Sequence, residues 1–212
     1  MFENRWGPVS ALEGIAASGR YGRRTGDVGM LVSEVAGAGL ASVMTRSGRR
    51  QALAAAVRSA FAAELPAAPR REDGGAIAFI WSGPDQWLAL TEVRPAKGME
   101  ALLAAPLAGL ASIVDKSHGL TLLRLAGPRI RDALAKGIAV DLNPRIFNSG
   151  CTAITAVAHI GVQFWQLDDR PTYEFAVPRG YVGSYWHWLA ASAAEYGVEL
   201  IRPSATGALR SA

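Results

Sequence analysis

The pattern of apolar and polar positions predicts two successive halves with the same order of elements. In the first half, residues 26–119, Leu53, Val57 and Phe61 recur at the spacing of one helical face, which predicts a helix over 48–65. The other apolar runs predict strands at 28–35, 76–81, 87–93 and 111–117 and a second helix at 98–107. The turn sequence from Ser82 to Asp85 joins the second and third of these strands into a hairpin.

The second half, residues 120–202, repeats this plan. Strands are predicted at 120–125, 152–160, 162–167, 173–177 and 198–201, with helices at 128–137 and 181–196. Hairpin turns require antiparallel neighbours, so the predicted fold is α+β. It consists of two related halves of strand-helix-strands-helix-strand, packed as one unit. We expect residues 1–25 to form an extended N-terminal arm and residues 203–212 a flexible tail.

Composition narrows the class of protein. Half of the 212 residues are hydrophobic and the net charge is only +4, without a basic stripe, which argues against nucleic-acid binding. No segment approaches the roughly 20 apolar residues that span a bilayer, so no membrane partner is expected. The N-terminus has no continuous apolar stretch suited to a signal peptide, and the single cysteine, Cys151, cannot form an internal disulfide. A cytoplasmic protein is therefore predicted.

One segment imitates a nucleotide-binding loop. Gly37-Ala38-Gly39-Leu40-Ala41-Ser42 follows a predicted strand, as the dinucleotide-binding fingerprint does. Its third small position is Ser where Gly or Ala is required, and no helix is predicted directly after it to receive a pyrophosphate. We therefore interpret the segment as a turn after a strand.

The remaining candidates for chemistry have no partners nearby in the sequence. The histidines, His118, His159 and His187, lie far apart, which argues against a metal site. His159 is predicted to be a core residue and His118 a loop contact. Cys151 has no basic flank, which favours a buried small hydrophobe over a nucleophile.

Carboxylates give no stronger signal. Asp168-Asp169 fits a solvated turn, while Asp85 and Asp115 lie near strand ends without an evident partner. We therefore predict no catalytic, cofactor-binding or metal-binding residue in this chain.

Aromatic residues of the last predicted helix suggest an interaction surface. The apolar face centred on Val182 and Leu189 leaves Trp188 about 120° away by the helical period, together with His187. A large aromatic side chain off the core face suits an interface anchor, and ordinary tertiary burial is the alternative. Trp188 and His187 are the interface candidates.

Several segments, taken in order, resemble the gamma subunit family of heterotetrameric sarcosine oxidases, over residues 28–200. The likeness lies in Arg46–Leu53 with Leu65-Pro66, the hairpin Trp81–Leu88, Val114–Leu142, Asn143-Pro144-Arg145, Tyr173–Val177 and the Trp-rich last helix. The order and spacing of these segments carry the resemblance, since no single one is diagnostic.

The resemblance implies a non-catalytic subunit that acts in assembly beside alpha, beta and delta subunits. The complex would demethylate sarcosine oxidatively to glycine, pass the one-carbon unit to tetrahydrofolate and form hydrogen peroxide, with FAD, FMN and NAD on the partner subunits. The family's fold is similar to the folate-binding part of glycine-cleavage aminomethyltransferases. An alternative is therefore a stand-alone folate-dependent aminomethyltransferase-like protein, in which Asp85 or Asp115 would hold the folate. A nucleic-acid or signalling adaptor would rest on the basic pI alone.

Overall fold

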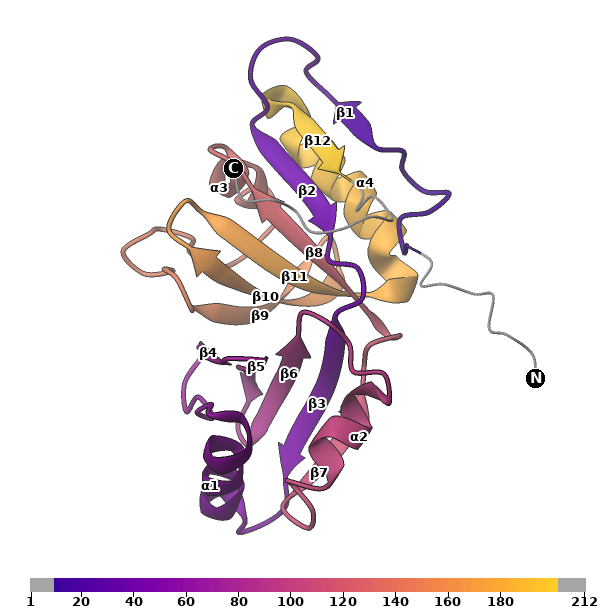
Figure 1. Cartoon of the computed structure of the whole chain (residues 1–212). Helices are drawn as coiled ribbons and strands as arrows, with labels where there is room; N and C mark the ends of the chain where they lie inside the picture. The colour runs from indigo at the N-terminus through magenta and orange to yellow at the C-terminus, as the bar shows by residue number, and fades with distance from the viewer. Residues whose placement is uncertain (1–9, 202–212) are drawn as a thin grey trace, which may run out of the picture.

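The computed structural model describes residues 10–201 and contains two β-sheets, each with helices on one face (Figure 1). The larger sheet has seven strands, in the spatial order β1 (Gly19–Tyr21), β12 (Val198–Ile201), β2 (Met30–Glu34), β8 (Leu120–Ala126), β11 (Thr172–Pro178), β10 (Ile160–Asp168) and β9 (Thr152–Val157). The smaller sheet has five strands, in the order β4 (Arg71–Gly74), β5 (Ile77–Gly83), β6 (Gln86–Thr91), β3 (Gly39–Thr45) and β7 (Ala111–Asp115). All pairings are antiparallel except that of β12 with β2.

Helices cover the outer face of each sheet. Within residues 10–201 the α-helices are α1 (Arg50–Phe61), α2 (Gly98–Ala104), α3 (Ile130–Leu134) and α4 (Val182–Ala193), and the 3-10 turns η1 (Arg179–Tyr181) and η2 (Ala194–Tyr196) flank α4. Leu53 and Val57 of α1 and Leu103 of α2 share a core with Phe79 of the five-stranded sheet. The seven-stranded sheet packs against α3 and α4 in a second core.

Strand alternation in β11 explains how one sheet serves two cores. Tyr173, Phe175 and Val177 point to the helices, whereas Glu174 and Ala176 point to the other sheet. Between the two sheets lies a third, smaller core, which we call the seam. Its buried apolar members are Ala38, Leu40, Ala78, Ile80, Leu88, Leu90, Leu122, Trp165 and Ala176.

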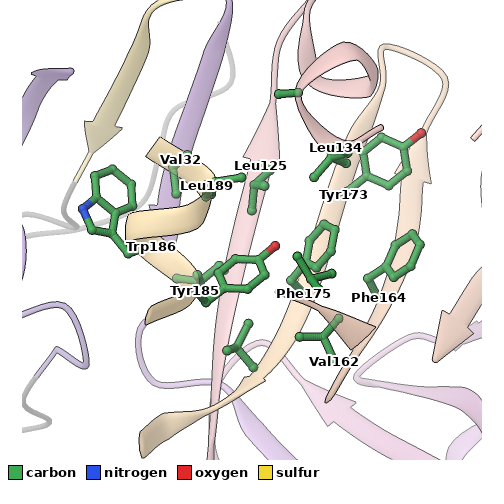
Figure 2. Packing of buried hydrophobic residues seen from close by; sticks show 14 of the residues in the cluster. Val32, Leu125, Leu134, Val162, Phe164, Tyr173, Phe175, Tyr185, Trp186 and Leu189 are labelled. Carbon is green, nitrogen blue, oxygen red and sulfur yellow. The ribbon is translucent and has the colours of Figure 1, made fainter. Parts of the chain in front are cut away.

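The helix-side core of the seven-stranded sheet is rich in aromatic rings (Figure 2). Phe164 and Phe175 are stacked with ring centroids 4.8 Å apart, and Phe147 stacks on Phe164 at 5.2 Å. Tyr185 of α4 approaches Phe175 at 5.7 Å, which ties the helix to the sheet. These separations are typical of attractive ring pairs.

Residues 10–25 differ from the predicted extended arm. Leu12 and Ala16 are buried in the core that the seven-stranded sheet shares with α3 and α4, and β1 pairs with β12. The carboxylate of Glu34 accepts hydrogen bonds from the Ala11 amide at 3.1 Å and from the Ser10 hydroxyl. Apolar burial and a carboxylate at the first turn hold this segment, a long-range arrangement that local composition does not reveal. Residues 1–9 and the predicted tail 203–212 lie outside the described residues.

The division between the sheets does not follow the predicted division between the halves. The first predicted strand, β2, belongs to the seven-stranded sheet, where it pairs with β12 and β8 of the second half. Two strands were also missed. Residues 39–42 of the segment interpreted as a turn begin the strand β3, which lies between β6 and β7, and residues 71–74, where no element was predicted, form the edge strand β4.

Candidate functional site

Asp85, a carboxylate at a predicted strand end, lies exposed in the β5–β6 turn with φ 59°. Its Oδ1 is 3.3 Å from Nη1 of Arg50, at the start of α1. Both side chains are about half exposed, at 51% each, so the pair is a surface ion pair of small energetic value. Asp85 therefore links the turn to α1.

Asp115 has a structural role at the end of β7. Its carboxylate accepts hydrogen bonds from the backbone amides of Met99, at 2.9 Å, and Ser117, at 2.8 Å. Partial burial acts to raise the pKa of Asp115, but the hydrogen bonds from Ser117 and Met99 and the nearby His118 outweigh it, so the pKa lies below its usual value. The charged carboxylate holds the first turn of α2 and is a weak base.

The histidine and cysteine predictions fare differently. His118 lies in the turn before β8, with Nε2 3.0 Å from Nη1 of Arg94, which confirms the predicted loop contact. His159 is exposed in the β9–β10 turn with φ 66°, so its placement in the core was wrong. Cys151 is half-buried and its Sγ lies 3.2 Å from Nη1 of Arg70. The predicted buried thiol without a basic neighbour is therefore also wrong, because Arg70 arrives from the other sheet.

Two further motifs have structural positions. Gly37 occupies a turn with φ 76°, while residues 39–42 of the apparent nucleotide loop lie in β3. A Cβ at Gly39 would come within 2.5 Å of Thr91 Oγ1, so close packing accounts for this glycine. Asp168 accepts a hydrogen bond from the Arg170 amide at 3.0 Å, as expected of a turn residue. Between residues 10 and 201, no three His, Cys, Asp or Glu side chains gather as a metal site would require.

A buried ion cluster in the seam was not predicted. Glu174 of β11 is 1% exposed. Its Oε1 accepts hydrogen bonds from Nε and Nη2 of Arg124, at 3.0 and 2.6 Å, and its Oε2 from Nη1 of Arg71, at 3.2 Å. Nε1 of Trp165 also donates to Oε2, at 2.8 Å. The signal was available in the sequence, since Glu174 interrupts the otherwise apolar strand 173–177.

The cluster joins the two sheets. Arg71 belongs to β4 of the five-stranded sheet, whereas Glu174, Arg124 and Trp165 belong to the seven-stranded sheet. Four hydrogen bonds satisfy the carboxylate of Glu174, and Arg71 also pairs with Asp73 at 2.7 Å. A carboxylate this fully bonded has little capacity left to take a proton from a substrate. Its arrangement suits a structural link.

The interface candidates lie on one helix but in different surroundings. His187 is exposed on α4, on the same side as Ser184 and the exposed Tyr181 of η1. Trp188 is half-buried, its ring centroid 5.8 Å from that of Tyr185. A Cβ at Gly137 would lie 2.6 Å from Cζ2 of Trp188, so the indole rests directly on the loop after α3. Part of Trp188 therefore packs within the chain, and its exposed part stays a predicted contact.

A known protein family matches most of this chain. The family model described as "Sarcosine oxidase, gamma subunit family" matches residues 47–195, more than half of the chain. The chain belongs to this family. Sarcosine oxidase subunit gamma of Arthrobacter sp is 29% identical over 147 residues, which cover 68% of this chain and 70% of the relative. The gamma subunit of Corynebacterium sp. (strain P-1) is 29% identical over 154 residues, covering 72% and 73%.

Solved structures support the same family and define the fold. A chain of the heterotetrameric sarcosine oxidase from Corynebacterium sp. U-96, solved with pyrrole 2-carboxylate, matches with a TM-score of 0.72 and 26% identity, covering 81% of this chain and 87% of that one. Aminomethyltransferase T of the glycine cleavage system from Bartonella henselae matches with a TM-score of 0.57 and 12% identity, covering 82% and 48%. The second likeness concerns the fold alone. This gamma-subunit family chain thus has the predicted α+β, aminomethyltransferase-like fold. None of its described helices is long and apolar enough to cross a membrane.

Proposed function

We propose that this chain is the gamma subunit of a heterotetrameric sarcosine oxidase, without catalytic residues of its own, and that it acts in assembly of the complex. The family match over residues 47–195 is the observation that carries the proposal. The chain also covers 87% of its counterpart in a heterotetrameric enzyme, so the likeness extends over almost the whole of that subunit.

The wider biochemical context is part of the same proposal. The complex demethylates sarcosine oxidatively to glycine, transfers the one-carbon unit to tetrahydrofolate and forms hydrogen peroxide in the cytoplasm. FAD, FMN and NAD are bound by the alpha and beta partners. The proposal that this chain has no catalytic residues of its own is supported by the roles of three carboxylates within the chain. Asp115 accepts two backbone hydrogen bonds, Glu174 accepts four hydrogen bonds, and Asp85 pairs with Arg50.

A stand-alone aminomethyltransferase is disfavoured. The chain covers only 48% of the aminomethyltransferase of similar fold. Asp85 and Asp115, the carboxylates that would have held the folate, lie in the β5–β6 turn and at the end of the edge strand β7, where they bind α1 and α2 respectively. We propose His187, and the exposed part of Trp188, as contacts with the partner subunits.

Co-expression with the genes of the candidate alpha, beta and delta subunits tests this function. We expect this chain to elute with the partners in size-exclusion chromatography, in a complex with flavin absorbance. His187→Asp should lower the co-eluting fraction. Glu72→Asp, at an exposed position on β4, should leave that fraction unchanged. A chain that stays alone when all partners are folded and present, and that binds tetrahydrofolate tightly in calorimetry, would overturn the proposal.

A further inference from the structure

Part of the five-stranded sheet has an uncovered face. Leu40 and Leu88 lie on the face that forms the seam, and the seven-stranded sheet covers them. The same face continues along β3 and β7, and Figure 1 shows β3 running away from the larger sheet toward its C-terminal end. There, Met44 is 45% and Val114 is 51% exposed. We call the surface formed by Ser42, Met44, Ser112 and Val114 the open face.

The register of the two strands makes these side chains neighbours. Met44 lies opposite Ser112, and Ser42 lies opposite Val114. Residues directly opposite in an antiparallel pair share one face of the sheet, and diagonal neighbours are about 7–8 Å apart. Met44 and Val114 are such a diagonal pair. Their exposed side chains therefore form one small apolar centre with a serine on either side.

Cations stand at both ends of this centre. The ladder continues by one residue in each direction, because the Arg46 amide donates to the Leu110 carbonyl and the Lys116 amide donates to the Leu40 carbonyl. Because residues two apart in a strand lie on the same face, Arg46 shares the face of Met44 and Lys116 shares the face of Val114. Both side chains are exposed, and neither has a carboxylate partner within residues 10–201.

The acidic groups near this surface are already engaged elsewhere. Asp115 follows Val114 and so lies on the opposite face, where it receives the Met99 amide of α2. Asp85, whose carbonyl accepts the Thr45 amide beside the end of β3, pairs with Arg50. The open face thus presents an apolar centre between two unneutralised positive charges.

We propose that the open face docks a partner subunit through a surface with an apolar centre flanked by carboxylates. The proposal rests on the proposed function, since the partner is one of the other subunits of the complex. Complementary charge favours this occupant, because carboxylates would pair with Arg46 and Lys116 while Met44 and Val114 lose water. A second copy of this chain would bring further cations into the same contact, which like-charge repulsion opposes.

The test uses the full chain co-expressed with the alpha, beta and delta subunits. Met44→Asp and Val114→Asp, separately and together, should reduce the fraction that co-elutes with the partners, at least tenfold for the double variant. Ile154→Asp is the matched control, because Ile154 is exposed to a similar extent, 54%, on β9 of the other sheet. Circular dichroism of each variant identifies any loss of folding. Ser42→Asp, a polar replacement on the open face, tests the same surface in a variant that keeps Met44 and Val114.

Charge reversal separates the contribution of Arg46 and Lys116 from that of the apolar centre. Arg46→Glu with Lys116→Glu should weaken co-elution, and added salt should weaken assembly of the wild-type chain more than that of this variant. If the wild-type chain does not assemble, the proposed function fails. If the wild-type chain assembles and the folded open-face variants assemble equally well, the open-face proposal alone is overturned. Self-association of the isolated chain that the Met44→Asp and Val114→Asp changes abolish would also overturn it.

Discussion

The two faces of the seven-stranded sheet are stabilised in different ways. Toward α4, Phe164, Phe175 and Tyr185 form a continuous set of packed rings (Figure 2). Toward the other sheet, the seam combines Ala, Leu, Ile and Trp165 with the buried Glu174, whose carboxylate receives four hydrogen bonds. The first face depends on apolar burial and the second on matched polar groups. Removing an apolar group should therefore be most costly on the helix side, and removing a charge most costly in the seam.

The largest loss of stability is expected on the face toward α4, which we call the aromatic face. Phe175 is fully buried between Phe164 and Tyr185, so Phe175→Ala should leave a cavity and lower the free energy of unfolding by about 3–5 kcal/mol. Urea denaturation followed by tryptophan fluorescence measures the change. Val93→Ala is the control, because Val93 is 80% exposed, and its effect should stay below about 0.5 kcal/mol. A loss under about 1 kcal/mol in Phe175→Ala would show that the aromatic face is not the main source of stability.

A smaller loss is expected in the seam. Glu174→Gln keeps the shape of the side chain and removes the charge that Arg71 and Arg124 share. Removing one partner of a buried pair costs roughly 3–5 kcal/mol. Here about 2–3 kcal/mol is expected, because the side chains of Arg71 and Arg124 are 13% and 31% exposed and retain some contact with water.

Urea denaturation of Glu174→Gln checks this value. Glu72→Gln is the control, since Glu72 is exposed on β4, next to Arg71 in the sequence. The two sheets should also separate more readily, which hydrogen exchange along β4 and β5 would detect. An equal effect in both variants would contradict a special role for Glu174 in the seam.

Local patterns predicted the elements whose sequence signal is strong. The spacing of Leu53 and Val57 identified α1, and the turn from Ser82 to Asp85 identified the β5–β6 hairpin. β3 was missed because its Gly and Ser residues imitate a turn, while its strand conformation depends on β6 and β7 at either side. Residues 10–25 were missed for a similar reason. Leu12 is buried in a core that includes residues of α4, at the other end of the chain.

The polar features of the candidate site were less accessible from the sequence. Arg71 lies 103 residues before Glu174, and Arg124 lies 50 residues before it, so spacing carries no sign of their contact. The position of Glu174 in an apolar strand indicates that its carboxylate needs a buried partner, but the sequence does not show which residue that partner is. Cys151 was misjudged because Arg70 reaches it across the boundary between the sheets. In contrast, the off-face position of Trp188 and His187 follows directly from helix geometry.

The smallest change in the free energy of unfolding is expected for a polar atom on the aromatic face. This change should be a gain in stability, whereas the other variants lose stability. The Tyr185 hydroxyl is buried and has no hydrogen-bond partner among the described residues, unlike Glu174 in the seam. A buried unsatisfied group costs about 1–3 kcal/mol, so Tyr185→Phe should raise the free energy of unfolding, by about 1 kcal/mol. Tyr181→Phe, a change at a tyrosine that is 59% exposed, should have no measurable effect. A loss of stability in Tyr185→Phe would mean that the hydroxyl is satisfied in solution.

Alkaline pH gives a second measure of the same contrast. Burial raises the pKa of Tyr185 well above its ordinary value, and burial also raises that of Tyr173, against the opposing influence of Arg131. A raised pKa in the folded state means that the proton is held more tightly there than in the unfolded chain. The contribution to stability is therefore complete below about pH 10 and declines as the pH rises toward the folded-state pKa. Tyr185→Phe should reduce this decline without abolishing it, because Tyr173 remains, and urea denaturation between pH 8 and about pH 11 compares the two slopes. Equal slopes in the wild-type chain and the variant would show that Tyr185 ionises without opening the aromatic face.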